Sequence, residues 1–163
     1  MAEPGDRKTL EIYLNDHLAG ATSALELMDD IIEGEADTPL VTFLRGLRSE
    51  VEEDLRTLEQ VAAALRVQRE RVKQLLADLG ESLSRAKLAR AGAPAELSLL
   101  LDLETLSVGI WGKTRLWRAL AAADVVGDDL HAVDLDELEV RGRRQLEQVE
   151  EHRLRIATRA LAG

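Results

Sequence analysis

Apolar residues recur at helical spacing along almost the whole chain, and short breaks containing Gly or Pro divide them into long segments. A spacing of three or four residues gives a helix one apolar face, whereas the alternation typical of a half-buried strand is not sustained anywhere in the sequence. Three segments carry clear stripes, which are Leu10, Leu14, Leu18, Ala21, Leu25, Met28 and Ile32; Leu44, Leu47, Val51, Leu55, Leu58, Ala62 and Leu65; and Leu135, Leu138, Gly142, Val149, Ile156 and Ala160. The sequence therefore predicts an all-α protein of long amphipathic helices.

Capping residues and breaks predict where the helices begin and end. Thr9 can cap the first helix, and Gly34 suits the position just after its last turn. Thr38 is expected to cap the second helix, with Pro39 at its first position. Pro94 can open a helix, and Asp134 begins a capping box. The predicted helical segments are 9–33, 38–65, 69–90, 94–123 and 134–161.

The 163 residues are expected to form a single domain with a flexible N-terminal segment, 1–8. The segment 66–93 decides the topology, because its helix of about 22 residues would span roughly 33 Å and can carry the chain back along the bundle. The helices before and after it would then run parallel, which is the single-crossover topology of a ferritin-like four-helix bundle. The alternative is an all-antiparallel array with an extra packed helix.

The segment 94–123 is apolar on two sides. One stripe holds Leu97, Leu100, Leu101, Val108 and Trp111, and the other holds Leu99, Leu103, Leu106 and Ile110. A helix of this kind needs a second cover, which either the crossover helix or a second copy of the chain would supply. Gly109 and Gly112 each cost about 1 kcal/mol of helix propensity relative to Ala, and close approach of a neighbouring backbone would explain that cost. We therefore expect a homo-oligomer, most simply a dimer.

Composition excludes several classes of function. The net charge of −10 opposes binding to nucleic acid, and four aromatic residues are too few for a platform that stacks bases. The absence of Cys excludes disulfides, iron–sulfur clusters and thiol nucleophiles. No apolar stretch is long enough to span a membrane, and the polar N-terminus does not resemble a signal peptide. We expect a cytoplasmic protein.

Five polar residues lie on or near the apolar stripes, namely His17, Glu50, Asp54, Glu104 and His152. Counting from the two predicted hairpin loops places His17 level with Asp54 and Glu104 level with His152. Imidazole and carboxylate together can bind iron, manganese or zinc. They also form ordinary buried ion pairs that need no cofactor, and the residues favour this interpretation. If Glu104 is buried against His152, its replacement by Ala would destabilise the fold by several kcal/mol.

Three runs, 13–21, 51–55 and 103–109, resemble uncharacterised bacterial proteins of the ferritin-like superfamily. Di-iron members of that superfamily carry one Glu on each of two helices and a Glu-x-x-His motif on each of the other two. The resemblance assigns Glu104 as one of the single Glu residues. It implies a ferritin-like scaffold.

The chain departs from the di-iron pattern at the remaining positions. Asp16 or His17 stands where the other single Glu is expected, Glu50-x-x-Glu53 replaces one Glu-x-x-His motif, and Val149-x-x-His152 replaces the second. These departures imply a lost or altered metal centre and argue against ferroxidase, oxygenase and iron-storage activity.

Two functional hypotheses follow from the sequence. The first is a non-catalytic helical bundle, without a cofactor, that acts through self-association or a protein partner. The second is a metal-binding bundle of the di-iron or manganese type that uses the inward carboxylates and histidines. The sequence contains no phosphate-binding loop and no motif of a Ser–His–Asp hydrolase, so the first hypothesis is favoured.

Overall fold

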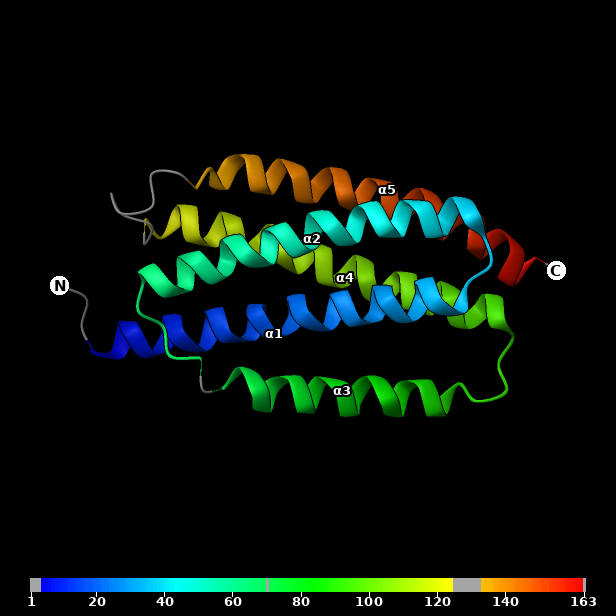
Figure 1. The fold of residues 1–163 in the computed structure, drawn as a ribbon, viewed down its shortest axis with the longest axis horizontal. Helices are drawn as coiled ribbons and strands as arrows, with labels where there is room; N and C mark the ends of the chain where they lie inside the picture. Colours follow the sequence, from blue (N-terminus) through cyan, green and yellow to red (C-terminus); the bar gives the residue numbers. More distant parts are fainter. Residues whose placement is uncertain (1–3, 70, 125–132, 163) are drawn as a thin grey trace.

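A computed structural model describes residues 4–69, 71–124 and 133–162, and these residues form helices joined by short connections (Figure 1). The described helices are α1 (Pro4–Gly34), α2 (Thr38–Ala64), α3 (Val72–Ala89), α4 (Ala95–Ala122) and α5 (Leu135–Leu161). The described part of the chain contains no strand. The prediction of an all-α protein is confirmed.

Most helix ends lie close to their predicted positions. The first helix is an exception, because α1 begins at Pro4 instead of Thr9; residues 4–8 are therefore helical, and residues 1–3 lie outside the described range. The N-cap of α2 is Asp37 and not the expected Thr38, because the Asp37 Oδ1 accepts a hydrogen bond of 3.2 Å from the Leu40 amide and Thr38 already lies in the helix. The capping box before α5 forms as predicted, with Asp134 Oδ1 accepting from Glu137 N at 2.9 Å. Residues 125–132 of the predicted loop after α4 lie outside the described residues.

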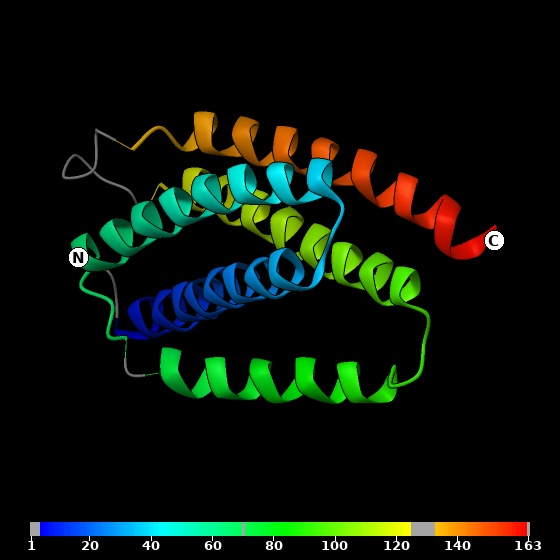
Figure 2. The same ribbon diagram turned by 45° about the vertical axis from the view of Figure 1, so that its right-hand side comes forward.

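The helices form two antiparallel hairpins joined by a crossover. Helices α1 and α2 make one hairpin and α4 and α5 the other, while α3 runs back along the outer side of α1 (Figures 1 and 2). Consequently α2 and α4 run in the same direction, as the length of the segment 66–93 predicted. The all-antiparallel alternative does not match this arrangement.

Helix α3 packs against α1, so α1 is buried on two sides. Asn15 is fully buried there, and its Nδ2 donates to the Gln68 carbonyl at 2.8 Å, which holds the connection before α3. Of the two covers expected for the segment 94–123, the crossover helix is the wrong one, because α3 packs against α1 and not along α4. Val108 and Trp111, from the stripe that also holds Leu97, are 71% and 51% exposed. A second copy of the chain as the cover stays a prediction.

The core consists of two apolar clusters at different heights along the bundle. One contains Leu25, Leu44, Val51, Leu103, Ile110 and Val149, among others. The second contains Leu14, Leu18, Leu58, Leu116, Trp117 and Leu138, among others. Leu55 packs against both clusters, and the buried polar residues Asp54, Lys113 and Gln145 lie between them along α2, α4 and α5.

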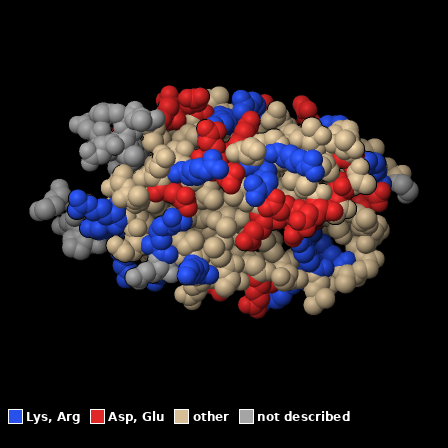
Figure 3. Space-filling model, in the orientation of Figure 1, with Lys and Arg blue, Asp and Glu red and all other residues tan. Residues whose placement is uncertain are grey.

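The surface carries both signs of charge. Lys and Arg side chains alternate with Asp and Glu side chains over the face shown in Figure 3, and salt bridges such as Arg48–Asp29 link neighbouring helices. None of the helices in the described residues is both long and apolar enough to cross a membrane.

Candidate functional site

A polar layer crosses the bundle between the two apolar clusters. Asp54 on α2, Lys113 on α4 and Gln145 on α5 occupy positions that continue the apolar spacing of their helices, and all three are buried. On α2, for example, Asp54 follows Val51 of one cluster and precedes Leu58 of the other. Buried polar groups of this kind are stable only when their hydrogen bonds are satisfied.

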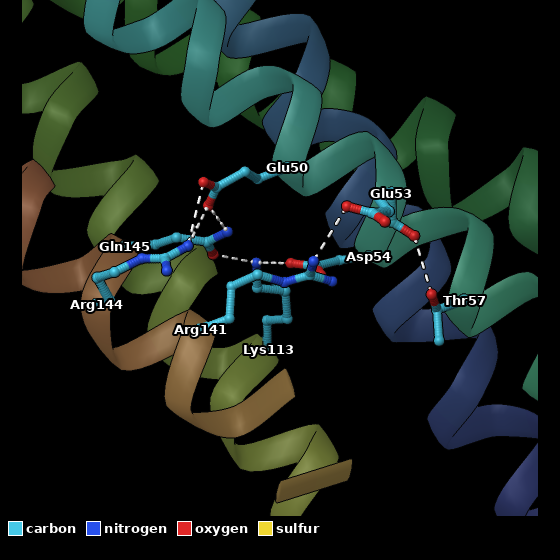
Figure 4. Close-up of polar contacts among 8 residues, drawn as sticks. All are labelled: Glu50, Glu53, Asp54, Thr57, Lys113, Arg141, Arg144 and Gln145. Carbon is cyan, nitrogen blue, oxygen red and sulfur yellow. Dashed lines mark hydrogen bonds and ion pairs between the residues drawn. The ribbon is translucent and has the colours of Figure 1, made fainter. Parts of the chain in front are cut away.

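Asp54 is the centre of the layer. Its side chain is 1% exposed and accepts from two cations, with Lys113 Nζ donating to Oδ2 and Arg141 Nη2 donating to Oδ1 (Figure 4). Lys113 Nζ also donates to Gln145 Oε1 at 2.5 Å, and Gln145 Nε2 donates to Glu50 Oε2 at 2.8 Å. A continuous set of hydrogen bonds therefore joins α2, α4 and α5.

Two arginines of α5 extend the layer to the surface. Arg141 Nη1 donates to Glu53 Oε2 at 3.1 Å, and Arg144 Nη2 donates to both carboxylate oxygens of Glu50 at 3.2 Å. Long side chains, rather than close approach of the backbones, thus connect α2 with α5. Arg side chains suit this role because their planar guanidinium can bond two carboxylates at once.

Burial and neighbouring charges shift the pKa values of two residues in the layer, Lys113 and Glu50. Burial lowers the pKa of Lys113 from its ordinary value of 10.5, and the charge of Asp54 and its hydrogen bond partly oppose that change. For Glu50, burial raises the pKa, but the hydrogen bond from Gln145 and the charges of Arg144 and Arg141 outweigh it, so the pKa lies below 4.5. The network therefore favours an ionised Glu50 at neutral pH.

Beside the polar layer lies a cavity of about 180 Å³ between α1, α2 and α4. Helix α1 contributes three small residues to the wall, Gly20, Ala21 and Ala24, together with Asp16 and His17 one turn earlier. The small residues leave space that the neighbouring helices do not fill. The rest of the wall is mainly apolar and includes Val51, Leu55, Leu58, Ile110, Leu116 and Trp117.

Three glycines line this cavity. A Cβ atom built on Gly20, Gly109 or Gly112 would have no atom of another element within 4 Å. The expectation that Gly109 and Gly112 permit close approach of a neighbouring backbone is therefore wrong for the helices of the chain itself, because both residues border open space. Close approach occurs instead at Gly142 of α5, where a Cβ would lie 2.6 Å from Thr114 Cγ2 of α4.

His17 and Trp117 also line the cavity. His17 is half-buried, its ring lies edge-on to Tyr13 at 4.7 Å, and burial lowers its pKa from 6.5 against the opposing charge of Asp16. Trp117 is fully buried. Its indole Nε1–H finds no hydrogen-bond acceptor in residues 4–69, 71–124 and 133–162.

The structure places the five predicted site residues in four different environments. Glu50 and Asp54 belong to the polar layer, and His17 shares the cavity wall with Asp54. Glu104 pairs with Arg153 at 3.2 Å instead of His152, and His152 stacks on Phe43 with ring centroids 4.3 Å apart. Within the described residues, no three His, Asp or Glu side chains are grouped so that they could hold a metal ion.

Glu104 does not pair with His152, because the buried face of α4 is not the face that carries Glu104. The buried residues of α4 include Leu99, Leu103, Leu106 and Ile110, whereas the Glu104 side chain is 44% exposed. Counting residues from the hairpin loop placed Glu104 at the correct height along the bundle, because its partner Arg153 is the residue after His152. It could not give the direction of the side chain, because successive residues on a helix point about 100° apart.

Sequence reasoning missed Lys113, Arg141 and Trp117 as parts of the site. Lys113 was detectable, because it continues the spacing of Leu106 and Ile110. Its partner Asp54 lies 59 residues away in the chain, and no local pattern links the two. Comparison with protein-family models, with curated protein sequences and with solved structures finds no match. The interpretation of the site therefore depends on its geometry.

Proposed function

We propose that the protein is a non-catalytic binding protein whose cavity between α1, α2 and α4 takes a small apolar molecule. The glycines of the wall are the observation that carries this proposal. Gly109 and Gly112 lie inside a long helix, where each costs about 1 kcal/mol relative to Ala, and no packing contact requires them. Their effect is to widen the cavity, which a binding function explains.

The size of the cavity sets the size of the molecule. A dry cavity of about 150 Å³ lined by apolar side chains is known to accept benzene. The cavity in this protein, about 180 Å³, has room for a six-membered ring with a short substituent, but it is open to solvent beside Gly20 and Gly109, which are both exposed. Apolar side chains provide most of the wall, as is common in small-molecule sites.

The charged residues beside the cavity are better suited to holding its shape than to chemistry. Asp54 already accepts from Lys113 and Arg141, so it is poorly placed to act as a general base or as a ligand of a metal ion. Glu104 is likewise engaged by Arg153. These contacts support a binding role over the metal-binding alternative.

The experiment compares binding of benzene, toluene and indole, measured by ligand-detected NMR and by the shift of the thermal midpoint. We expect saturable binding to the wild-type chain and at least tenfold weaker binding to Gly109→Ala/Gly112→Ala, which narrows the cavity. Gly46→Ala is the matched control, because Gly46 lies inside α2, contacts nothing within 4 Å at its Cβ position and does not line the cavity. Equal binding to all three proteins, or no binding to any, would refute the proposal.

We further propose that α1, α2, α4 and α5 form a ferritin-like bundle with α3 as its crossover. The parallel course of α2 and α4 and the position of α3 outside α1 support this assignment, because a single long crossover is the mark of that topology. An experimental structure would test it through the order and direction of these helices.

Self-association is a second candidate, favoured by one observation. Val108 and Trp111 lie one turn apart on α4, both are exposed, and Arg115 lies over the Trp111 ring at 4.8 Å. Light scattering after gel filtration tests this candidate. A dimer that becomes a monomer in Val108→Lys/Trp111→Lys would support it, and an 18.0 kDa wild-type species would exclude it.

A further inference from the structure

We infer that the outer side of α4 is a self-complementary dimer surface, on which two copies of the chain pair their α4 helices antiparallel about a twofold axis beside residues 109–110. This inference rests on the self-association proposed above and specifies its geometry. It does not depend on the ligand of the cavity. The partner is a second copy of this chain, recognised by apolar contact together with paired opposite charges.

The residues on the outer side of α4 recur at alternating intervals of three and four. None of them is buried in the single chain, and α3 packs along α1 instead of covering them. Alternating intervals of three and four residues are the repeat by which one helix packs along another in a coiled coil. We call this set the α4 seam, and it consists of Leu97, Leu101, Glu104, Val108, Trp111, Arg115, Arg118 and Ala122.

The α4 seam is complementary to itself when two copies run antiparallel. With the twofold axis between residues 109 and 110, Val108 of each copy lies opposite the partner's Trp111. Glu104 of each copy lies opposite the partner's Arg115. A twofold axis repeats every contact, so two apolar contacts lie at the centre and a pair of opposite charges lies on either side. In a parallel pair each seam residue would face its own copy, and the like charges would repel.

The structure leaves the central side chains of the seam available for these contacts. Val108 is 71% exposed and Trp111 is 51% exposed. Arg115 lies over the Trp111 ring at 4.8 Å and forms no ion pair within the described residues. Arg153 bonds Oε1 of Glu104, and Oε2 of Glu104 accepts no bond from the described part of the chain. The seam therefore presents apolar surface and unused charge at the heights where a second copy supplies the complement.

Charge reversal tests the pairing of Glu104 with Arg115. Dissociation constants of the dimer are measured by analytical ultracentrifugation for the wild-type chain, Glu104→Arg and Arg115→Glu. We expect a wild-type dimer and at least tenfold weaker dimerisation of each variant, because each places like charges across the axis on both sides. Glu81→Arg is the matched control, since Glu81 is exposed on α3 and, like Glu104, pairs with an Arg of its own chain. This control should dimerise like the wild-type chain.

An equimolar mixture of the two variants is the decisive measurement. A heterodimer of Glu104→Arg with Arg115→Glu places opposite charges at both positions, so we expect its dissociation constant to lie within about threefold of the wild-type value. Residues 104 and 115 lie about 16 Å apart along one helix, so contact within a single chain cannot produce this recovery. Recovery also shows that the two variants are folded, because a misfolded chain would not regain its partner.

Introduced cysteines test the direction of the paired helices, because the chain contains no Cys of its own. In the antiparallel pair, Leu101 lies opposite the partner's Arg118, whereas the Leu101 side chains of the two copies lie about 25 Å apart along the seam. We expect a disulfide-linked dimer when Leu101→Cys is mixed with Arg118→Cys and oxidised. Leu101→Cys oxidised alone should give almost none. A parallel pair would give the reverse result.

The outcomes distinguish this inference from the proposals before it. If the wild-type chain stays an 18.0 kDa monomer at millimolar concentration, self-association and this inference both fail, and the binding function of the cavity is unaffected. If the chain dimerises but charge reversal has no effect, or the mixture does not recover, another surface forms the dimer and the inference is wrong. Disulfide linkage of Leu101→Cys alone would overturn the antiparallel direction.

Discussion

Helix α4 meets its two neighbours in opposite ways. Toward α5 the helices are close enough that Gly142 has no room for a side chain, since a Cβ there would lie 2.6 Å from Thr114 Cγ2. Toward α1, Gly109 and Gly112 face a cavity, and a Cβ at either position would contact nothing within 4 Å. Glycine therefore allows a close contact between α4 and α5, whereas between α4 and α1 it leaves space unfilled.

Lys113 connects the two sides of α4. Its Cε lies 3.9 Å from the Cβ position of Gly142, and its Nζ reaches Asp54 on the cavity wall. The close contact with α5 and the position of the cavity wall are thus linked through one buried side chain. The comparison teaches that a helix glycine can be interpreted only when its neighbour across the interface is known.

The largest change in the free energy of unfolding is expected from breaking the ion pair between Lys113 and Asp54. Asp54→Ala would leave Lys113 buried without its counter-ion, and we expect the free energy of unfolding to fall by about 3–5 kcal/mol. Urea denaturation measures the change. Glu53→Ala is the matched control, because Glu53 bonds the same Arg141 from an exposed position, and we expect a loss below about 1 kcal/mol. Similar losses in the two variants would show that the layer is not buried as described.

The close contact between α4 and α5 is tested by Gly142→Ala. The added methyl group must displace Thr114, whose Oγ1 is held by a hydrogen bond of 2.7 Å to the Trp111 carbonyl. We expect a net loss of about 1–2 kcal/mol, because overpacking outweighs the gain in helix propensity. In a Thr114→Ser background, which removes Cγ2, the same substitution should become stabilising. A loss that persists in that background would place the conflict elsewhere.

At the cavity between α4 and α1, a glycine replacement should change the free energy of unfolding in the opposite direction. Gly109→Ala meets no atom and improves helix propensity, so we expect a gain of about 0.5–1 kcal/mol in thermal or urea denaturation. The gain should match that of Gly46→Ala, whose Cβ position is also free. A destabilised Gly109→Ala would mean that α1 lies closer to α4 than the structure shows.

The fold was largely predictable because its evidence is local. The stripes through Leu44 and Val51 and the capping box at Asp134 each depend on residues within one or two helical turns. The length of the segment 66–93 predicted that α4 runs parallel to α2, and the structure shows this course. The start of α1 was missed because Thr9 has the chemistry of a cap but lies within the helix.

The site was predictable only in part, because it depends on which face of α4 is buried. Apolar residues lie on both sides of this helix, so periodicity alone does not choose between Glu104 and Lys113. Asp54 and Glu50 were identified because α2 has a single stripe. Their partners Arg141 and Gln145 come from a helix about 90 residues later, and only the tertiary structure joins them.

The cavity also predicts a pH dependence. Because burial lowers the pKa of His17 below 6.5, protonation favours the unfolded chain, and stability present at pH 7.5 is lost progressively as the pH falls through 6.5. His152 has a pKa shifted in the same direction and contributes a share of its own. Urea denaturation between pH 7.5 and 5.5 should give a shallower decline for His17→Gln than for the wild-type chain. Identical slopes would show that His17 is solvated in the folded state.

The smallest effect is expected at Glu104, a carboxylate on the same helix as Lys113 but on its exposed side. The side chain of Glu104 is 44% exposed, and Arg153 keeps a second partner, Glu150, at 2.7 Å when Glu104 is removed. Glu104→Ala should therefore change the free energy of unfolding by no more than about 0.5 kcal/mol in urea. Asp54→Ala deletes a carboxylate from a buried position where it pairs with Lys113 and Arg141, so the difference between the two variants reports burial together with the loss of those partners. A loss of several kcal/mol for Glu104→Ala would mean that the face of α4 toward Arg153 is the buried one. The α4 residues assigned to the cavity wall would then not face a cavity.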